Sequence, residues 1–132
     1  MISYDEFQQS EMSSLFQKKN SAVGYLKVIV STATDALPLE GAKVKVYKDI
    51  GENQIVFFQG QTNSSGVIDD ISLPCPKSVS LGSLEIPEYE LYQLDVSLDG
   101  YQSVYNYSVG VFQNIKVIQD ISMIPIVNIE EK

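Results

Sequence analysis

Short stretches of alternating hydrophobic and polar residues run through most of the chain after residue 23. In one of them Val44 and Val46 alternate with lysines, so one face of an extended strand is apolar and the other is polar. Gly, Pro, Asn and Asp residues separate the stretches, as is typical of a β-sandwich rather than of alternating strands and helices. The pattern predicts an all-β, antiparallel sandwich with seven strands at about residues 24–33, 42–49, 54–60, 67–73, 89–98, 101–109 and 114–124. The residues expected to form its core are Leu26, Val28, Val30, Val44, Val46, Ile71, Leu94, Val96, Val104, Ile118 and Ile121.

Turn residues join these strands. Asn63-Ser64-Ser65-Gly66 predicts an Asx-type turn closed by a glycine with positive φ. Asp99-Gly100 predicts a two-residue hairpin between the fifth and sixth strands. The longest irregular stretch, Pro74 to Pro87, is the loop expected to present a binding surface.

The first 23 residues lack strand alternation and show helical spacing instead. Ser3 and Glu6 have the spacing of a capping box, and an apolar stripe follows, so we expect a short helix over about residues 4–18. A disordered leader is the alternative. The stripe consists of Phe7, Met12, Leu15 and Phe16.

The domain organisation follows from these patterns. Seven strands already provide a complete core, so the apolar stripe is expected to bind a partner and residues 1–23 to form a docking segment. Deletion of that segment is then expected to leave a folded sandwich over residues 24–126. Residues 127–132 form an acidic C-terminal tail.

Composition narrows the class of partner. The chain has 132 residues and a formal net charge of −8, and all nine basic residues are lysines. A chain without arginine and with this charge is a poor ligand for nucleic acid. No apolar run is long enough to enter a membrane, and the first residues lack the features of a secretory signal. We therefore expect no nucleic-acid partner, no membrane insertion, and synthesis in the cytoplasm followed by assembly into a particle.

The sequence lacks the residues that most hydrolases and zinc sites require. There is no histidine to activate a serine or Cys75, and one cysteine without histidine cannot form a zinc site. Asp69-Asp70 and the Glu88–Glu90 pair are expected to be solvated carboxylates. These observations favour a protein that is not an enzyme and that uses no cofactor or metal.

Tyrosines cluster on the fifth and sixth predicted strands. Exposed aromatic side chains can stack on sugar rings or anchor a protein partner, although cross-strand packing also favours aromatics. The tyrosines considered as partner-binding residues are Tyr92, Tyr101 and Tyr105.

Several segments in order resemble one family. They are Gly24-Tyr25-Leu26-Lys27-Val28, Pro38-Leu39-Glu40-Gly41-Ala42-Lys43-Val44, the Asn63–Gly66 turn, Leu73-Pro74-Cys75-Pro76, Asp99-Gly100-Tyr101 and Ile118–Pro125. Together they resemble the carboxypeptidase-regulatory-like domain, a transthyretin-like (prealbumin-like) Greek-key sandwich, as found in spore-forming Gram-positive bacteria. The resemblance implies an accessory or interaction module.

These sequence features favour two alternative functions. The first is a structural or protein-interaction subunit of a larger assembly, such as a phage, phage-tail-like or spore-associated particle, with other proteins or copies of itself as partners. The second is a stand-alone module that recognises glycan or peptidoglycan through the tyrosines or the Pro74 to Pro87 loop.

Overall fold

The computed structural model describes residues 1–33 and 36–127. Two short helices, α1 (Tyr4–Gln8) and α2 (Ser13–Lys19), lie near the N-terminus, and the remainder is built from strands. The strands are β1 (Ile2–Ser3), β2 (Ala22–Thr32), β3 (Leu37–Pro38), β4 (Lys43–Ile50), β5 (Asn53–Gln61), β6 (Val67–Cys75), β7 (Val79–Leu81), β8 (Leu84–Ile86), β9 (Tyr89–Ser97), β10 (Val104–Phe112) and β11 (Lys116–Ser122).

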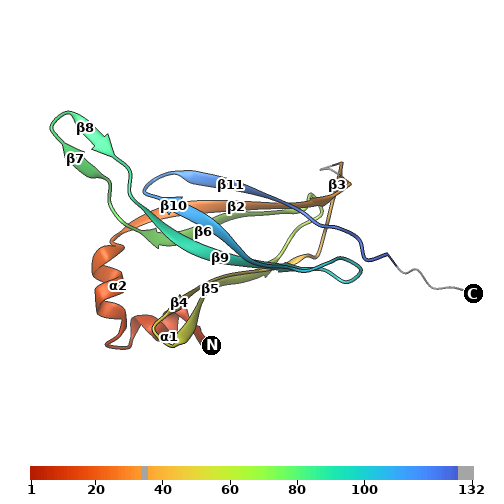
Figure 1. Cartoon of the computed structure of the whole chain (residues 1–132), viewed down its shortest axis with the longest axis horizontal. Helices are drawn as coiled ribbons and strands as arrows, with labels where there is room; N and C mark the ends of the chain where they lie inside the picture. Colours follow the sequence, from red (N-terminus) through yellow and green to blue (C-terminus); the bar gives the residue numbers. More distant parts are fainter. Residues whose placement is uncertain (34–35, 128–132) are drawn as a thin grey trace, which may run out of the picture.

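Two sheets face each other and form the predicted sandwich (Figure 1). One has the strand order β1-β5-β4-β9-β10, and the other has the order β11-β2-β3, with β6 also paired to β2. The seven long strands correspond to the seven predicted runs, which confirms the all-β sandwich. The sheets are mixed rather than wholly antiparallel, because β11 pairs in parallel with β2, and β1 with β5.

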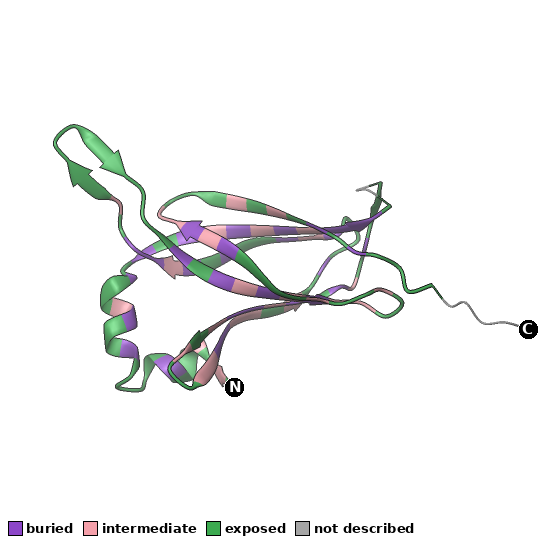
Figure 2. Cartoon of the chain, in the orientation of Figure 1, coloured by how far each residue is buried: buried purple, intermediate pink, exposed green. Residues whose placement is uncertain are grey.

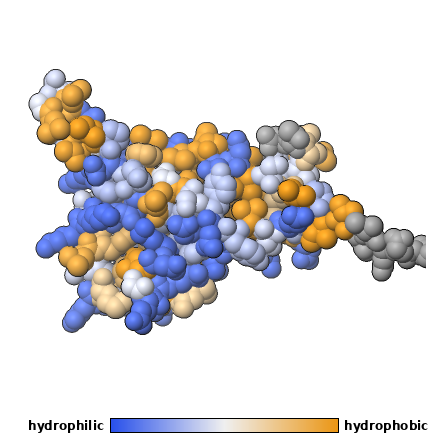
Figure 3. Space-filling view, viewed as in Figure 1, coloured by the Kyte–Doolittle hydropathy of each residue, from blue (hydrophilic) through white to orange (hydrophobic). Residues whose placement is uncertain are grey.

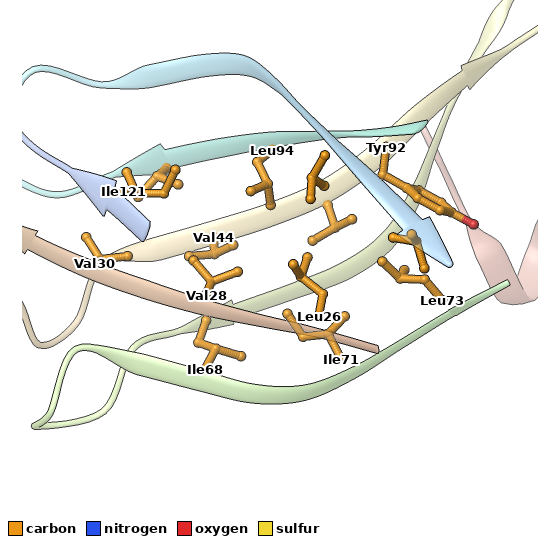
Figure 4. Packing of buried hydrophobic residues seen from close by; sticks show 14 of the residues in the cluster. Leu26, Val28, Val30, Val44, Ile68, Ile71, Leu73, Tyr92, Leu94 and Ile121 are labelled. Carbon is orange, nitrogen blue, oxygen red and sulfur yellow. The ribbon is translucent and has the colours of Figure 1, made fainter. Parts of the chain in front are cut away.

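The core between the sheets contains most of the residues expected there (Figure 4). Two expectations need correction. Val104 is only partly buried, and Ile118 is 57% exposed. The reason for Ile118 is the two-residue period of a strand: Ile121 points into the core, so Ile118, three positions earlier, points outward.

The two predicted turns had different outcomes. Asn63 forms the Asx turn, because its Oδ1 accepts hydrogen bonds from the N–H groups of Ser65 (2.9 Å) and Val67 (3.0 Å). At Asp99-Gly100 the predicted turn is present, since the N–H of Tyr101 donates to the carbonyl oxygen of Leu98 at 3.0 Å, and β9 and β10 pair in antiparallel fashion. Its length is corrected, because strand pairing resumes only at Val104, opposite Val96, and a longer connection separates the two strands. Within that connection, Tyr101 forms a bridge with Pro125 instead of extending β10.

The N-terminal residues pack on their own sandwich. The Ser3–Glu6 capping box is present at the start of α1, but the helix expected over 4–18 is divided into α1 and α2. Phe7 is 1% exposed and, with Phe16 and Ile55, forms a second apolar cluster against β5. This cluster corrects the expectation that the segment stands apart from the domain. The acidic tail is described only at Val127, and its residues 128–132 lie outside the described part.

Candidate functional site

A hairpin formed by β7 and β8 projects from one end of the sandwich (Figure 1). We call residues Val79–Ile86 the arm. Val79 pairs with Ile86, and Leu81 pairs with Leu84 across a turn in which Gly82 has a φ of 63°. Cross-strand partners and i,i+2 neighbours share a face, so all four aliphatic side chains lie on one face of the arm. Ser80 and Glu85 pair on the opposite face.

All the residues of the arm's two strands are exposed (Figure 2). The exposed fractions of its four aliphatic side chains lie between 39% for Ile86 and 67% for Leu84. Figure 3 shows these residues as an apolar surface at the projecting end of the molecule. At the base of the arm, the N–H of Ser78 donates to Gln113 Oε1 at 2.9 Å, which ties the arm to the end of β10. A protruding aliphatic face of this kind is typical of an interaction site.

The Pro74 to Pro87 stretch, predicted as a binding loop, contains a hairpin that was not predicted. The sequence feature that indicates this hairpin is the alternation of Val79-Ser80-Leu81 and Leu84-Glu85-Ile86 about Gly82-Ser83. Strands of only three residues are short enough to be mistaken for loop.

The N-terminal stripe is divided between core and surface. Phe7 and Phe16 are buried, so the expectation that they contact a partner is corrected. Their rings pack around Phe57 and Tyr4; the Phe16 and Phe57 ring centroids are 5.7 Å apart. Met12 and Leu15 remain exposed, Leu15 by 79%.

The three tyrosines considered for binding lie in different environments. Tyr92 is fully buried and donates its hydroxyl to the carbonyl oxygen of Pro74, and burial is the main cause that raises its pKa. It is therefore a core residue and not a contact for a partner. Tyr101 is partly buried and Tyr105 is exposed, so the structure does not gather the three into one surface.

Another aromatic pair does form a surface. The rings of Tyr89 and Phe112, on paired positions of β9 and β10, have centroids 5.6 Å apart. Gly110 lies beside both rings and adds no side chain above them. Tyr89 is exposed and Phe112 is partly buried. We call this pair the aromatic platform.

Glu90 is not the solvated carboxylate that the sequence suggested. Its side chain is 6% exposed, and its Oε2 lies 2.6 Å from the Lys48 ammonium. Lys19, at the C-terminal end of α2, lies 3.2 Å from Oε1, at ion-pair distance but without the geometry of a hydrogen bond. Lys48 also donates to the carbonyl oxygen of Leu91 at 2.7 Å. Through these two lysines, Glu90 links β9 to β4 and to the end of α2.

Asp69 and Asp70 are exposed carboxylates, as expected, but both lie close to one lysine. The Lys116 ammonium lies 3.0 Å from Asp69 and 3.2 Å from Asp70. Asp70 has a φ of 59°, and a register shift lies at this point of the β2–β6 pair, so the two side chains do not point to opposite faces. The hydrogen bond with Lys116 is the main cause that lowers the pKa of Asp69.

A polar network on the outer face of β4 and β9 had no signal in the sequence. The Tyr47 hydroxyl lies 2.9 Å from Asp95 Oδ1 and also bonds Asn106, which has a φ of 57° in the bulge of β10. Burial, followed by the bond to Asp95, raises the pKa of Tyr47 to about 12. Lys45 lies over the Tyr47 ring, 5.0 Å from its centroid.

Cys75 is free and buried. Within residues 1–33 and 36–127, no group of three or more His, Cys, Asp or Glu side chains could hold a metal ion. No helix in that part of the chain has the length and hydrophobicity needed to cross a membrane.

No family model matches the chain, and no curated protein matches its sequence. Its structure is similar to 3-chlorocatechol 1,2-dioxygenase from Rhodococcus opacus 1CP, with a TM-score of 0.51 and 9% identity over 80% of this chain and 61% of that chain. It is also similar to catechol 1,2-dioxygenase from Acinetobacter sp. ADP1, with a TM-score of 0.51 and 10% identity over 84% of this chain and 57% of that chain. The chain thus spans less than two thirds of either enzyme.

This finding corrects the expectation that the protein stands outside the enzymes. The two solved structures named above are enzymes, so the fold itself gives no ground for placing the chain outside the enzymes. At 9–10% identity the likeness shows the fold and assigns no reaction.

Proposed function

We propose that the protein is a building block of a larger protein assembly and that it docks through the aliphatic face of the arm. The observation that carries the proposal is the single-faced exposure of Val79, Leu81, Leu84 and Ile86 on an element that projects from the sandwich. Burial of a fully exposed aliphatic side chain contributes roughly 1.5–3 kcal/mol, and these four, which are 39–67% exposed, would each contribute part of that amount. A protein surface that buries this face would therefore bind with a substantial hydrophobic contribution.

The architecture of the arm supports the same role. An isolated two-stranded hairpin is marginally stable in water, and the described β7 and β8 pair only with each other. Contact with a partner would supply the packing that such a hairpin lacks. The resemblance to carboxypeptidase-regulatory-like domains also favours an interaction module, and the proposed settings are a phage, phage-tail-like or spore-associated particle.

Size fractionation of extracts from the native host tests the proposal. The wild-type chain is expected in a high-mass fraction, and the double variant Leu81→Ser, Leu84→Ser is expected at the mass of a single chain. Ser80→Ala with Glu85→Gln, on the opposite face of the same strands, is the matched control and should remain in the high-mass fraction. Wild-type protein at the mass of a single chain, or an arm variant that stays in the high-mass fraction, would contradict the proposal.

The aromatic platform supports a second candidate, recognition of glycan or peptidoglycan. Sugar rings stack on exposed aromatic faces, and Gly110 leaves the space beside Tyr89 and Phe112 open. Titration of the purified protein with soluble peptidoglycan fragments should then give binding that Tyr89→Ala abolishes and Tyr105→Ala retains. Equal binding by the two variants would rule out the platform as the site.

A further inference from the structure

A hollow lies where the arm joins β9. Its volume is about 420 Å³, which falls within the range of about 300–1,000 Å³ typical of small-molecule sites. Side chains from the end of α2, from β4 and from the residues around the start of β9 line it, among them Lys19, Lys48, Glu88, Tyr89 and Glu90. The four aliphatic residues of the arm are not part of its lining, so a ligand in the hollow would leave the aliphatic face of the arm open.

One oxygen of the buried Glu90 carboxylate lacks a hydrogen bond. Oε2 lies 2.6 Å from the Lys48 ammonium, whereas Oε1 accepts no hydrogen bond within residues 1–33 and 36–127. The Lys19 ammonium lies 3.2 Å from Oε1, but its side chain is 66% exposed, so a ligand that replaces it gives up only a weak surface ion pair. A buried acceptor without a hydrogen bond is costly. The hollow therefore favours a ligand that donates a hydrogen bond to Oε1.

Lys48 supplies a donor beside this acceptor. An ammonium group has three N–H donors, and two of them are directed at Glu90 Oε2 and at the carbonyl oxygen of Leu91, 2.7 Å away. These contacts and the ring of Tyr92, whose centroid is 5.7 Å from the ammonium, hold the side chain in place. One N–H remains for a ligand. An acceptor and a donor this close together match two adjacent hydroxyl groups, because one hydroxyl can donate while its neighbour accepts.

The charges that line the hollow cancel. Lys19 and Lys48 are cationic, and Glu88 and Glu90 are anionic. A cationic ligand would meet two ammonium groups, and an anionic ligand would meet two carboxylates. The formal net charge of −8 disfavours an anion further. The hollow is therefore best suited to a neutral ligand.

Tyr89 belongs both to the hollow and to the aromatic platform. It is 54% exposed, and Leu91, which points to the same face two positions along β9, is 43% exposed. A pyranose ring has an apolar C–H face that stacks on an aromatic ring and a rim of adjacent hydroxyl groups. A peptide main chain fits less well, because the N–H and C=O groups of a trans amide point in opposite directions and cannot meet Glu90 and Lys48 together.

Resting on the second candidate function, we infer that the hollow binds a neutral saccharide, with Tyr89 stacked on the sugar ring and with Glu90 and Lys48 bound to two adjacent hydroxyl groups. The inference extends the glycan site from the aromatic platform into the hollow and makes the sugar, rather than a charged or peptide part of a glycan, the group that is recognised.

Isothermal titration calorimetry of the full chain with neutral soluble saccharides tests the inference. The probes are the tetramers of N-acetylglucosamine, of glucose and of mannose, which carry no charge and no peptide. The wild-type chain is expected to bind at least one of them, with an affinity that salt does not change because the ligand is neutral. Glu90→Gln should weaken this binding roughly 10–100-fold, because hydrogen bonds to charged groups are the stronger ones. Glu85→Gln, the same change at an exposed position of the arm, is the matched control and should bind as the wild type does.

A second measurement changes the sugar and keeps the wild-type protein, so it does not depend on the folding of a variant. Monodeoxy analogues of the bound saccharide are compared with the parent sugar. Loss of either of two adjacent hydroxyl groups should weaken binding about tenfold or more. Loss of a hydroxyl group elsewhere on the ring should have little effect.

Three results would overturn the inference. A wild-type chain that binds none of the three tetramers would show that the hollow is not a site for a neutral saccharide. Binding that a folded Glu90→Gln variant retains in full, or that every monodeoxy analogue retains, would show that Glu90 and Lys48 do not contact the sugar. The second candidate function fails separately, when Tyr89→Ala leaves the binding of peptidoglycan fragments unchanged. Fragments that bind through Tyr89 while the neutral tetramers do not would leave that function standing and would assign recognition to the peptide of peptidoglycan.

Discussion

The N-terminal segment and the arm both carry aliphatic or aromatic residues outside the seven long strands, but only the N-terminal segment buries any of them, its two phenylalanines, within the chain. Phe7 and Phe16 reach the cluster around Ile55, whereas the four aliphatic residues of the arm remain at least 39% exposed. An apolar stripe in a sequence indicates that burial of its side chains would be favourable. Only the tertiary structure shows whether the same chain buries them.

The difference has a local cause. Strand β1 pairs with β5, and this brings α1 over Ile55 and Phe57, where the aromatic rings of the segment find partners. The arm instead leaves the sandwich between β6 and β9 and projects from its end (Figure 1). The four predictions below test this contrast, from the largest expected effect on stability to the smallest.

Phe7→Ala should destabilise the protein most. Phe7 is 1% exposed, and truncation of a buried Phe to Ala costs about 3–5 kcal/mol, or roughly 10–20 °C in melting temperature for a domain of this size. Leu15→Ala, in the same segment but 79% exposed, should change the unfolding free energy by less than about 0.5 kcal/mol. Thermal unfolding of both variants measures this. Equal melting temperatures would mean that the N-terminal helices are not part of the core, and the contrast would fail.

Lys48→Met tests the buried ion pair that joins β4 to β9 beside the end of α2. The change leaves the buried Glu90 carboxylate without its 2.6 Å partner, and breaking a buried ion pair in this way costs about 3 kcal/mol. Lys19→Met is the control, because the Lys19 side chain is 66% exposed and such ion pairs contribute less than about 1 kcal/mol. Urea unfolding compares the two. A larger loss for Lys19→Met would reverse the roles assigned to the two lysines.

Tyr47→Phe tests a polar contact of the sandwich itself, which involves neither the N-terminal segment nor the arm. At neutral pH, loss of the bonds to Asp95 and Asn106 should cost about 1–1.5 kcal/mol. Folding raises the pKa of Tyr47 from 10.0 to about 12, so its contribution is complete below pH 10 and is lost as the pH rises to about 12. The difference in unfolding free energy between wild type and variant should therefore shrink across that window. A difference that grows with pH would contradict the raised pKa.

The arm variant Leu81→Ser, Leu84→Ser should have the smallest effect on folding. Both side chains are exposed, so the unfolding free energy at a concentration where the protein is a single chain should change by less than about 0.5 kcal/mol. Calorimetry on dilute protein measures this. A loss comparable to that of Phe7→Ala would mean that the arm packs on its own sandwich.

The alternation of apolar and polar residues was sufficient to predict the seven long strands and most of the core, because both depend on which face of a strand is apolar. The parallel pairing of β11 with β2 could not be predicted, since the two-residue period is the same in parallel and antiparallel strands. The same period, applied strictly, would have placed Ile118 and Ile121 on opposite faces.

The candidate site was less accessible to sequence reasoning. The burial of Glu90 depends on Lys48 from β4 and Lys19 from α2, which are far from it in the chain. Asp69 and Asp70 both contact Lys116 because of a bulge between β2 and β6, and no residue type in the sequence predicts that bulge. The arm was detectable from its alternation about Gly82, but its exposure was not, because exposure depends on the direction in which β6 and β9 leave the sandwich.

Amide hydrogen exchange tests the contrast between the two regions most directly. The measurement compares the wild-type chain in its assembly with the single-chain arm variant Leu81→Ser, Leu84→Ser. The amides of the arm, residues Val79–Ile86, are expected to gain protection in the assembly, while those of Tyr4–Lys19 should be equally protected in both samples because α1 and α2 already pack on β5. New protection over Tyr4–Lys19, with none in the arm, would contradict the account and identify the N-terminal segment as the docking surface.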